Sequence, residues 1–268
     1  MEASNSRLVD YRAKEGVAVI ELCNPPMNSF TFEMMHELDE AILKARFDDE
    51  VHAIVRCGAG DRVFCAGVDI RMLHAVAPGF RSAFLLHASE TLDRLEHTPK
   101  LVIAALNGHT VGGGMEIALA ADLRIARKGA GRIGLPEVQL GLMPGMGGTK
   151  RLTRLVNPGR AIELMVTGEL MTFEEAQRLG LVNDVWEAAS AEDFLEKVLR
   201  HARGFGPPQR AAKAVGHIKR AVQSGGELPV EAAQALEREL EQLLFQSEDA
   251  KEGLSAYLDK RKPEFRGK

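Results

Sequence analysis

The chain has 268 residues, of which 45% are hydrophobic and 27% are charged, and its formal net charge at pH 7 is −4. This balance is typical of a globular protein with a substantial hydrophobic core, in one large domain or one domain with an appendage. The mildly acidic charge gives no basic field, so nucleic acid is not an expected partner.

Cysteine usage and hydropathy indicate the compartment. The three cysteines, Cys23, Cys57 and Cys65, form no CxxC or Cys/His spacing, so we expect no metal site and a reducing environment. The N-terminal stretch, residues 1–16, has neither the apolar segment of a secretory signal nor the acid-poor helix of a transit peptide. Every apolar run is far shorter than a membrane span. The sequence therefore predicts a cytoplasmic protein without a membrane partner.

Short apolar runs alternate with a helical pattern through the first half of the chain. Residues 17–22 (VAVIEL), 53–57 (AIVRC) and 101–106 (LVIAAL) are rich in β-branched and apolar residues and predict buried strands. Between the first two strands, residues 30–45 carry apolar side chains at helical spacing. This alternation predicts an α/β fold built in layers.

The next predicted elements are a short helix and a short strand. Thr172 and Glu175 have the spacing of a capping box, and Gly180 stands where a glycine would end that helix. Residues 181–186 then predict a strand.

Beyond about residue 190 only helical patterns remain. Residues 232–245 carry an apolar helical stripe. Ser247 is a candidate N-cap, with Glu248 and Asp249 in the first turn of a last helix. The C-terminal quarter of the chain is therefore predicted to be entirely helical.

A triple glycine separates the strand at 101–106 from a helical segment. The glycines from Gly112 to Gly114 allow unusual backbone dihedral angles and a close approach by a ligand. The first amides of the helix have no internal acceptor, so they are ready donors to a carbonyl oxygen that gains negative charge. Glu116, three residues after Gly113, shares a face with it. The segment fits equally well a packing turn with an exposed first-turn glutamate.

Two further segments combine small residues with one acid each. The segment GLPEVQLGLMPGMGGT is dense in glycine and proline but not polar, which is typical of a structured loop near a ligand. Glu137 is its only acid, and a solvated loop acid is an equally good interpretation. In DRVFCAGVDI, Ala66 and Gly67 could expose a second backbone donor, although a plain loop with Asp69 as N-cap is the better interpretation of this segment alone.

Together these segments resemble the crotonase family, the enoyl-CoA hydratase/isomerase superfamily. FCAGVDI is similar to its first oxyanion motif, NGHTVGGGMEIALAADLRIA to its second, and GLPEVQLGLMPGMGGTKRL to the loop that carries its second acid. TGELMTFEEAQRLGLVNDV and the ending EGLSAYLDKRKPEF also match. The motifs follow the family's order and cover nearly the whole chain, which chance does not explain.

The resemblance implies both fold and assembly. We expect an α/β crotonase-like spiral of ββα units over residues 1–195 and a C-terminal all-helical trimerisation region over residues 196–268. Trimers of this family usually pair into hexamers, so a homotrimer or a dimer of trimers is expected. The implied substrate is an acyl-CoA thioester, and because coenzyme A is part of that substrate, no separate cofactor is expected.

The resemblance also implies a mechanism. The amides of Val68 and Gly113 would form an oxyanion hole for the thioester carbonyl, each contributing about a few kcal/mol. Hydration needs a base and an acid on one face of the double bond, so Glu116 would activate water and Glu137 would supply the Cα proton. Two neighbouring carboxylates should also raise the pKa of one glutamate.

Because family members that keep both acids are typically hydratases, the expected activity is enoyl-CoA hydratase or, in reverse, dehydratase. The alternatives are a Δ3,Δ2-enoyl-CoA isomerase or another acyl-CoA lyase or hydrolase on the same scaffold. A non-catalytic RNA-binding member would lack the acids or carry a lysine-rich helix. The acids are present and residues 30–45 contain a single lysine, so this hypothesis is weak.

Four residues match family positions that hold the substrate. Gly145 matches the glycine whose amide holds the water, and Ala66 would lie in the adenine pocket. Lys260 would lie near a CoA phosphate, contributed by a neighbouring subunit, and is otherwise a solvated tail charge. Tyr257 would border the acyl or pantetheine region and is otherwise an interface residue.

The match also has departures, which affect the acyl pocket more than the mechanism. The stretch between the acids, ARKGAGRIGLPE, is one residue longer than usual, and Leu135 stands where many hydratases carry a polar residue. Arg71 and His74 could meet a polar acyl tail, but a solvated helix face is the better interpretation. His109 and Cys65 are interpreted as structural residues.

Overall fold

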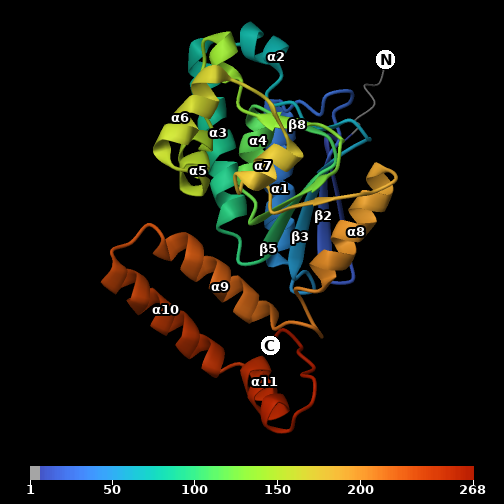
Figure 1. Cartoon of the computed structure of the whole chain (residues 1–268), viewed down its shortest axis with the longest axis vertical. Helices are drawn as coiled ribbons and strands as arrows, with labels where there is room; N and C mark the ends of the chain where they lie inside the picture. Colours follow the sequence, from blue (N-terminus) through green and yellow to red (C-terminus); the bar gives the residue numbers. More distant parts are fainter. Residues whose placement is uncertain (1–6) are drawn as a thin grey trace.

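The computed structural model describes residues 7–268, so the beginning of the N-terminal stretch, residues 1–6, lies outside the described part. Figure 1 shows a body of sheets and helices and, extending from one end of it, the three C-terminal helices. None of the helices within residues 7–268 is both long and apolar enough to cross a membrane.

A six-stranded main sheet forms the centre of the body, with strand order β1-β2-β3-β5-β7-β10. Its strands are β1 (Val9–Lys14), β2 (Val17–Leu22), β3 (Ala53–Gly58), β5 (Leu101–Leu106), β7 (Leu123–Arg127) and β10 (Asp184–Trp186). Only β1 and β2 pair antiparallel, and all other neighbours are parallel. Strands in the middle of such a sheet are buried on both faces, which is why β2, β3 and β5 are mostly apolar, with Glu21 and Arg56 as the charged exceptions.

A second, four-stranded sheet has the order β4-β6-β8-β9. Its strands are β4 (Val63–Cys65), β6 (His109–Val111), β8 (Arg132–Gly134) and β9 (Met171–Thr172). Along the chain, β4, β6 and β8 each follow a strand of the main sheet and precede a helix. The chain thus repeats a ββα unit, in which one strand joins the main sheet and the next joins the second sheet. This is the repeat that the resemblance implied.

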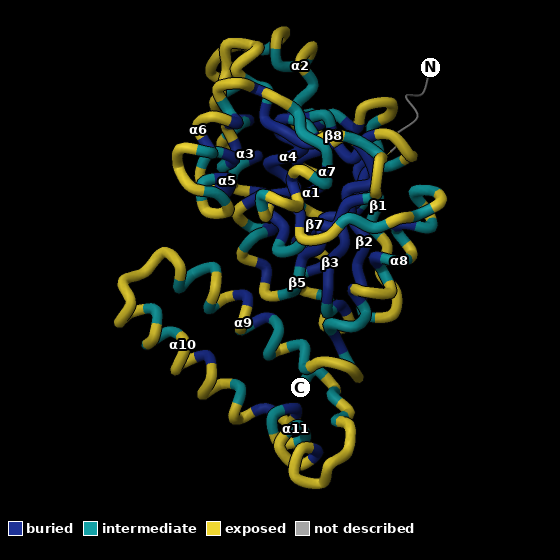
Figure 2. Tube along the Cα trace, in the orientation of Figure 1, coloured by how far each residue is buried: buried dark blue, intermediate teal, exposed yellow. Residues whose placement is uncertain are grey.

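Helices cover both faces of the main sheet (Figure 1). The body contains α1 (Phe32–Phe47), α2 (Ile70–Ala75), α3 (Pro78–Glu96), α4 (Gly113–Leu119), the 3-10 helix η1 (Glu137–Leu140), α5 (Gly148–Leu155), α6 (Pro158–Thr167), α7 (Phe173–Arg178) and α8 (Ala191–Arg203). Successive strand residues point to opposite faces, so Ile54 joins the large core under α1, α3 and α4, whereas Val55 joins a smaller core under α8. Figure 2 shows the buried chain concentrated in the strands and α4.

Two predicted boundaries need correction. The first helix begins at Phe32 and not at Phe30, because Phe30 pairs with Val68 in a β-bridge and Thr31 caps the helix. Of the strand predicted at 181–186, only Asp184–Trp186 is extended in the sheet. The preceding amides of Leu181 and Val182 instead bond to the carbonyl of Ala176 and close the end of α7.

Three predicted helix signals are confirmed. Thr172 and Glu175 form a reciprocal capping box at the start of α7, and Gly180, just after it, has a φ of +77°. Ser247 caps the last helix by accepting a hydrogen bond from the Ala250 amide.

The C-terminal region is helical, as predicted, and consists of α9 (Ala212–Gly225), α10 (Val230–Phe245) and α11 (Glu248–Leu258). The division expected after residue 195 falls inside α8, which packs on the main sheet. A buried ion pair of 2.8 Å between Lys219 on α9 and Asp122 fastens the helical region to the body. Much of α9 and α10 is exposed or half-buried within one chain (Figure 2).

Candidate active site

The glycine turn between β6 and α4 is built on close backbone contacts. Gly112 has a φ of +57°, which favours glycine. A Cβ on Gly114 would lie 2.0 Å from the carbonyl oxygen of Cys65, and a Cβ on Gly113 would lie 2.7 Å from the ring of Phe30. The turn therefore needs glycine for packing as well as for backbone conformation, and it brings α4 against the end of β4.

Two backbone amides lie at this junction. Gly67 has a φ of +89°, and a Cβ on it would lie 3.1 Å from the amide nitrogen of Gly113. The Phe30 amide donates to the Gly67 carbonyl, and the Phe30 carbonyl accepts from the Asp69 amide, both at 2.9 Å. The Val68 amide between them takes no part in this pairing. Neither the Val68 nor the Gly113 amide has an acceptor among residues 7–268. Free donors at such a junction are suited to stabilising a carbonyl oxygen that gains charge.

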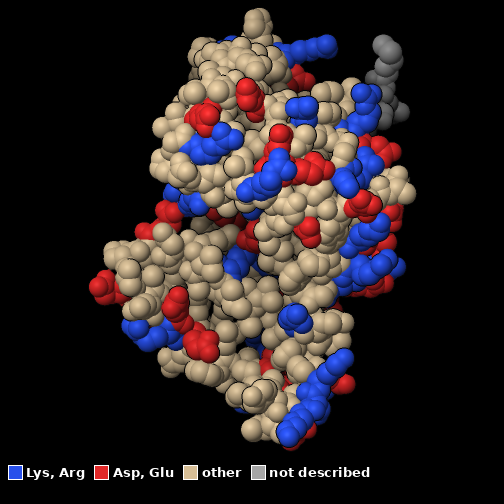
Figure 3. Space-filling view, in the orientation of Figure 1, with Lys and Arg blue, Asp and Glu red and all other residues tan. Residues whose placement is uncertain are grey.

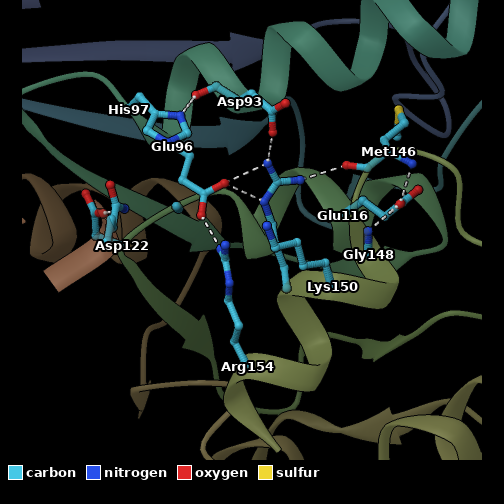
Figure 4. Close-up of polar contacts among 12 residues, drawn as sticks. Asp93, Glu96, His97, Glu116, Asp122, Met146, Gly148, Lys150 and Arg154 are labelled. Carbon is cyan, nitrogen blue, oxygen red and sulfur yellow. Dashed lines mark hydrogen bonds and ion pairs between the residues drawn. The ribbon is translucent and has the colours of Figure 1, made fainter. Parts of the chain in front are cut away.

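Glu116, one turn into α4, is only 2% exposed. Its Oε1 accepts hydrogen bonds from the amides of Met146, at 2.7 Å, and Gly148, at 2.8 Å (Figure 4). Burial raises the pKa of Glu116, while these amides, the nearby Gly145 amide and the charge of Arg151 oppose the rise. The alternative of an exposed first-turn glutamate is therefore wrong.

Glu137 reaches the same turn from the start of η1. Its Oε1 lies 3.0 Å from the position that a Cβ on Gly112 would occupy. Its Oε2 is buried and has no hydrogen-bond partner in the described part of the chain. Burial, and then the charge of Glu116, raise the pKa of Glu137 to about 7. The expected like-charge effect is thus present, but burial is the larger cause.

The remaining predicted site residues fall into two groups. Ala66 and Gly145 belong to the loops around the glycine turn, where Ala66 precedes Gly67 and donates its amide to Met27, and Gly145 precedes Met146. Tyr257, which is 83% exposed, and Lys260 lie at the end of α11. Figure 1 shows α11 at one end of the molecule and α4, which carries Glu116, within the body and well separated from it. One chain therefore does not bring these two residues to the glutamates.

Other candidates have local structural partners. Asp69 caps α2 by accepting from the Met72 amide at 2.9 Å, as its segment alone suggested. His109 accepts from the Arg132 amide at 3.2 Å. Cys65 is fully buried, and burial raises the pKa of its thiol to about 11, which disfavours a nucleophilic thiolate. No group of three or more metal-binding side chains that could hold an ion occurs within residues 7–268.

The fold and this site define a crotonase-type protein, and comparison with known proteins agrees. The enoyl-CoA hydratase/isomerase family model matches residues 12–268. The chain is 37% identical over 257 residues to the short-chain-enoyl-CoA hydratase of Clostridium acetobutylicum and 35% identical over 253 residues to the crotonyl-CoA hydratase of Syntrophomonas wolfei. Each alignment covers 94% of this chain and 95% of the relative.

Solved structures show the same relation. The crystal structure described as "Enoyl-CoA hydrates from Geobacillus Kaustophilus HTA426" superimposes with a TM-score of 0.94 at 42% identity, covering 99% of this chain and 98% of that one. This chain therefore belongs to the enoyl-CoA hydratase/isomerase family, and the crotonase-like fold expected from the sequence is confirmed.

Proposed function

We propose that this protein is an enoyl-CoA hydratase, which adds water to a 2-enoyl-CoA thioester or removes it in the reverse direction. The observation that carries the proposal is the pair of glutamates at the glycine turn, the buried Glu116 and the half-buried Glu137. The curated relatives that are named as hydratases support the same reaction.

The two unbonded amides supply the electrostatic part of the mechanism. When the thioester oxygen lies between the amides of Val68 and Gly113, their N–H groups stabilise the enolate that forms as water attacks Cβ. Such donors are already oriented, so they cost no reorganisation during the reaction and each contributes about a few kcal/mol.

The glutamates move the protons. Ionised Glu116 takes a proton from water as the hydroxyl oxygen bonds to Cβ, and the electron pair of the double bond moves to the thioester oxygen. Glu137, with a pKa near 7, then gives its proton to Cα. A carboxylic acid whose pKa is close to the working pH is the more effective donor. The amide of Gly145 would help to hold the attacking water.

The coenzyme A part of the substrate would extend from the glycine turn to the surface. Ala66 is next to Gly67 and would contact the adenine. Tyr257 and Lys260 are exposed at the end of α11 and would come from a neighbouring subunit of a trimer, with Lys260 facing a CoA phosphate. Coenzyme A belongs to the substrate, and the proposed reaction requires no separate cofactor.

A panel of acyl-CoA substrates tests the proposal. The purified protein should consume short 2-enoyl-CoAs with loss of the conjugated thioester absorbance and form the 3-hydroxyacyl-CoA. A protein that shifts the double bond of 3-enoyl-CoA without adding water would instead be an isomerase. Hydrolysis to free coenzyme A would identify a thioesterase, and either outcome would overturn the hydratase proposal.

A further inference from the structure

Arg151 is a buried cation in the first turn of α5, and it is only 5% exposed. Its Nη1 donates to the carbonyl of Met146 at 2.7 Å. Its Nε donates to Glu96 at 2.8 Å, and its Nη2 contacts Asp93 at 2.7 Å, both on α3 (Figure 4). All three nitrogens of the guanidinium are therefore engaged, and the group joins α3 to the loop before α5.

The loop held by Arg151 is the loop that holds Glu116. Met146 accepts from Arg151 through its carbonyl and donates to Glu116 through its amide, at 2.7 Å. Gly147 has a φ of +92°, and a Cβ on it would lie 2.4 Å from Arg151 Nη1. The guanidinium therefore fits here only because this residue is glycine. Gly148 then gives the second amide to Glu116. A shift of Arg151 would thus move both donors to the carboxylate.

The ion pairs continue outward from Glu96. This carboxylate also binds Arg154 at 3.0 Å. Arg154 and Lys150 both contact Glu227, which lies in the turn between α9 and α10. The outer residues of this series of ion pairs are more exposed than Arg151, so they should contribute less to holding the loop in place.

We propose that Arg151 is a positioning residue for Glu116, and that Glu96 orients Arg151 from α3. The expected effect of Arg151 on the catalytic rate rests on the proposed function. Its expected effect on the stability of the loop at residues 146–148 does not. Arginine suits this role because its planar fork binds a carboxylate and a carbonyl in fixed directions, which a lysine ammonium does not.

Steady-state kinetics of a graded set of variants tests the inference. Arg151→Gln should lower kcat by about 10²-fold with little change in KM, because a small displacement of a catalytic group has that effect. Arg151→Lys keeps the charge, so its kcat should be about tenfold higher than that of Arg151→Gln. Glu96→Gln should cost less than about tenfold, and Glu227→Gln less than about twofold.

Arg124 provides the matched control. It is a buried arginine, 4% exposed, that also donates to backbone carbonyls, those of Leu181 and Ala121, but it does not contact the loop of Met146. Arg124→Gln should lower the melting temperature while leaving kcat of the folded enzyme unchanged. An equal fall of kcat in this variant and in Arg151→Gln would assign the effect to general loss of stability and overturn the positioning role.

Amide hydrogen exchange gives a readout that needs no substrate. In Arg151→Gln the amides of Met146 and Gly148 should exchange about tenfold faster, because their loop opens more readily. They should keep the wild-type rate in Arg124→Gln. If the wild type hydrates no enoyl-CoA, the proposed function fails while the exchange result still decides the positioning role. Wild-type exchange rates of the Met146 and Gly148 amides in both Arg151→Gln and Glu96→Gln would overturn the positioning role.

Discussion

The two glutamates are held in different ways, and this difference supports their assignment. Burial raises the pKa of Glu116, but two backbone amides bonded to one of its oxygens oppose this rise, because hydrogen bonds to a carboxylate favour its ionised form. Glu137 has a buried oxygen without a protein partner, and burial favours its neutral form. The addition of water requires an ionised base and a protonated acid, and the amides on Glu116 and the buried oxygen of Glu137 fit these two roles.

Removing either acid group should abolish most of the activity. Glu116→Gln and Glu137→Gln keep the size of the side chain but cannot exchange a proton, so kcat should fall by roughly 10²–10⁴-fold. Steady-state rates with a short 2-enoyl-CoA measure the loss, and circular dichroism checks that the variants are folded. Wild-type rates in either variant would show that the corresponding glutamate is not catalytic.

The pKa of Glu137, near 7, predicts that both directions of the reaction slow down at high pH. In hydration Glu137 must be protonated, so kcat/KM should fall as the pH rises above about 7. In dehydration Glu137 takes the Cα proton while a protonated Glu116 gives a proton to the departing hydroxyl. The pair again carries one proton, so kcat/KM for dehydration should fall in the same way. A hydration rate that stays constant to about two pH units above the pKa would contradict the assignment of the acid.

At the scale of single strands, two buried arginines differ in their partners. Arg56 in β3 is fully buried, and none of its three side-chain nitrogens has a hydrogen-bond partner among residues 7–268. Burial lowers its pKa to about 10. Arg124 in β7 is also buried but donates to two carbonyls. Burying an unpaired charge is costly, whereas a satisfied one stabilises its strand.

Replacing these arginines with methionine should therefore have opposite effects on stability. Arg56→Met should raise the free energy of unfolding by about 1–3 kcal/mol, because an apolar side chain of similar length suits the core. Arg124→Met should lower it by about 1–3 kcal/mol, since the carbonyls of Leu181 and Ala121 lose their donor. Urea denaturation measures both, and a loss of stability in Arg56→Met would show that its guanidinium supports the fold.

Long apolar strands were predictable from the sequence, whereas very short ones were not. Residues 17–22, 53–57 and 101–106 are strands because their β-branched runs are buried on both faces. The strands of the second sheet, with only two or three residues each, carry no periodic pattern and were not predicted from the residues. The resemblance supplied the ββα repeat that joins the two sheets.

The candidate site was predictable only where a motif carried it. Glu116 and Glu137 stand beside unusual glycine and proline segments, which are typical of a structured loop close to a ligand. Arg151 has no such signal, because an arginine in the sequence GTKRLTRL resembles a solvated charge on an exposed helix. Its burial depends on Asp93 and Glu96, more than fifty residues earlier in the chain, and only tertiary structure brings them together.

At the scale of the whole molecule, the body and the C-terminal helices have different surfaces. On the face in Figure 3, charged side chains of both signs are interspersed and wide uncharged areas remain over the C-terminal helices. The exposed apolar residues of α9, α10 and α11 include Ile218, Val222, Val230, Leu243, Phe245, Leu254, Tyr257 and Leu258. An apolar surface of this kind is typical of an interaction site.

We expect this surface to form a homotrimer, alone or paired into a hexamer, that completes the coenzyme A site. The double variant Ile218→Glu with Val222→Glu places charges on α9, where the two side chains are 62% and 71% exposed. It should reduce the solution mass to that of one chain and raise KM, because Lys260 no longer reaches a neighbour's substrate. Lys260→Ala is the matched control, which should raise KM but keep the mass. Light scattering and steady-state kinetics separate the two effects, and a wild type that is monomeric in solution would contradict the shared site.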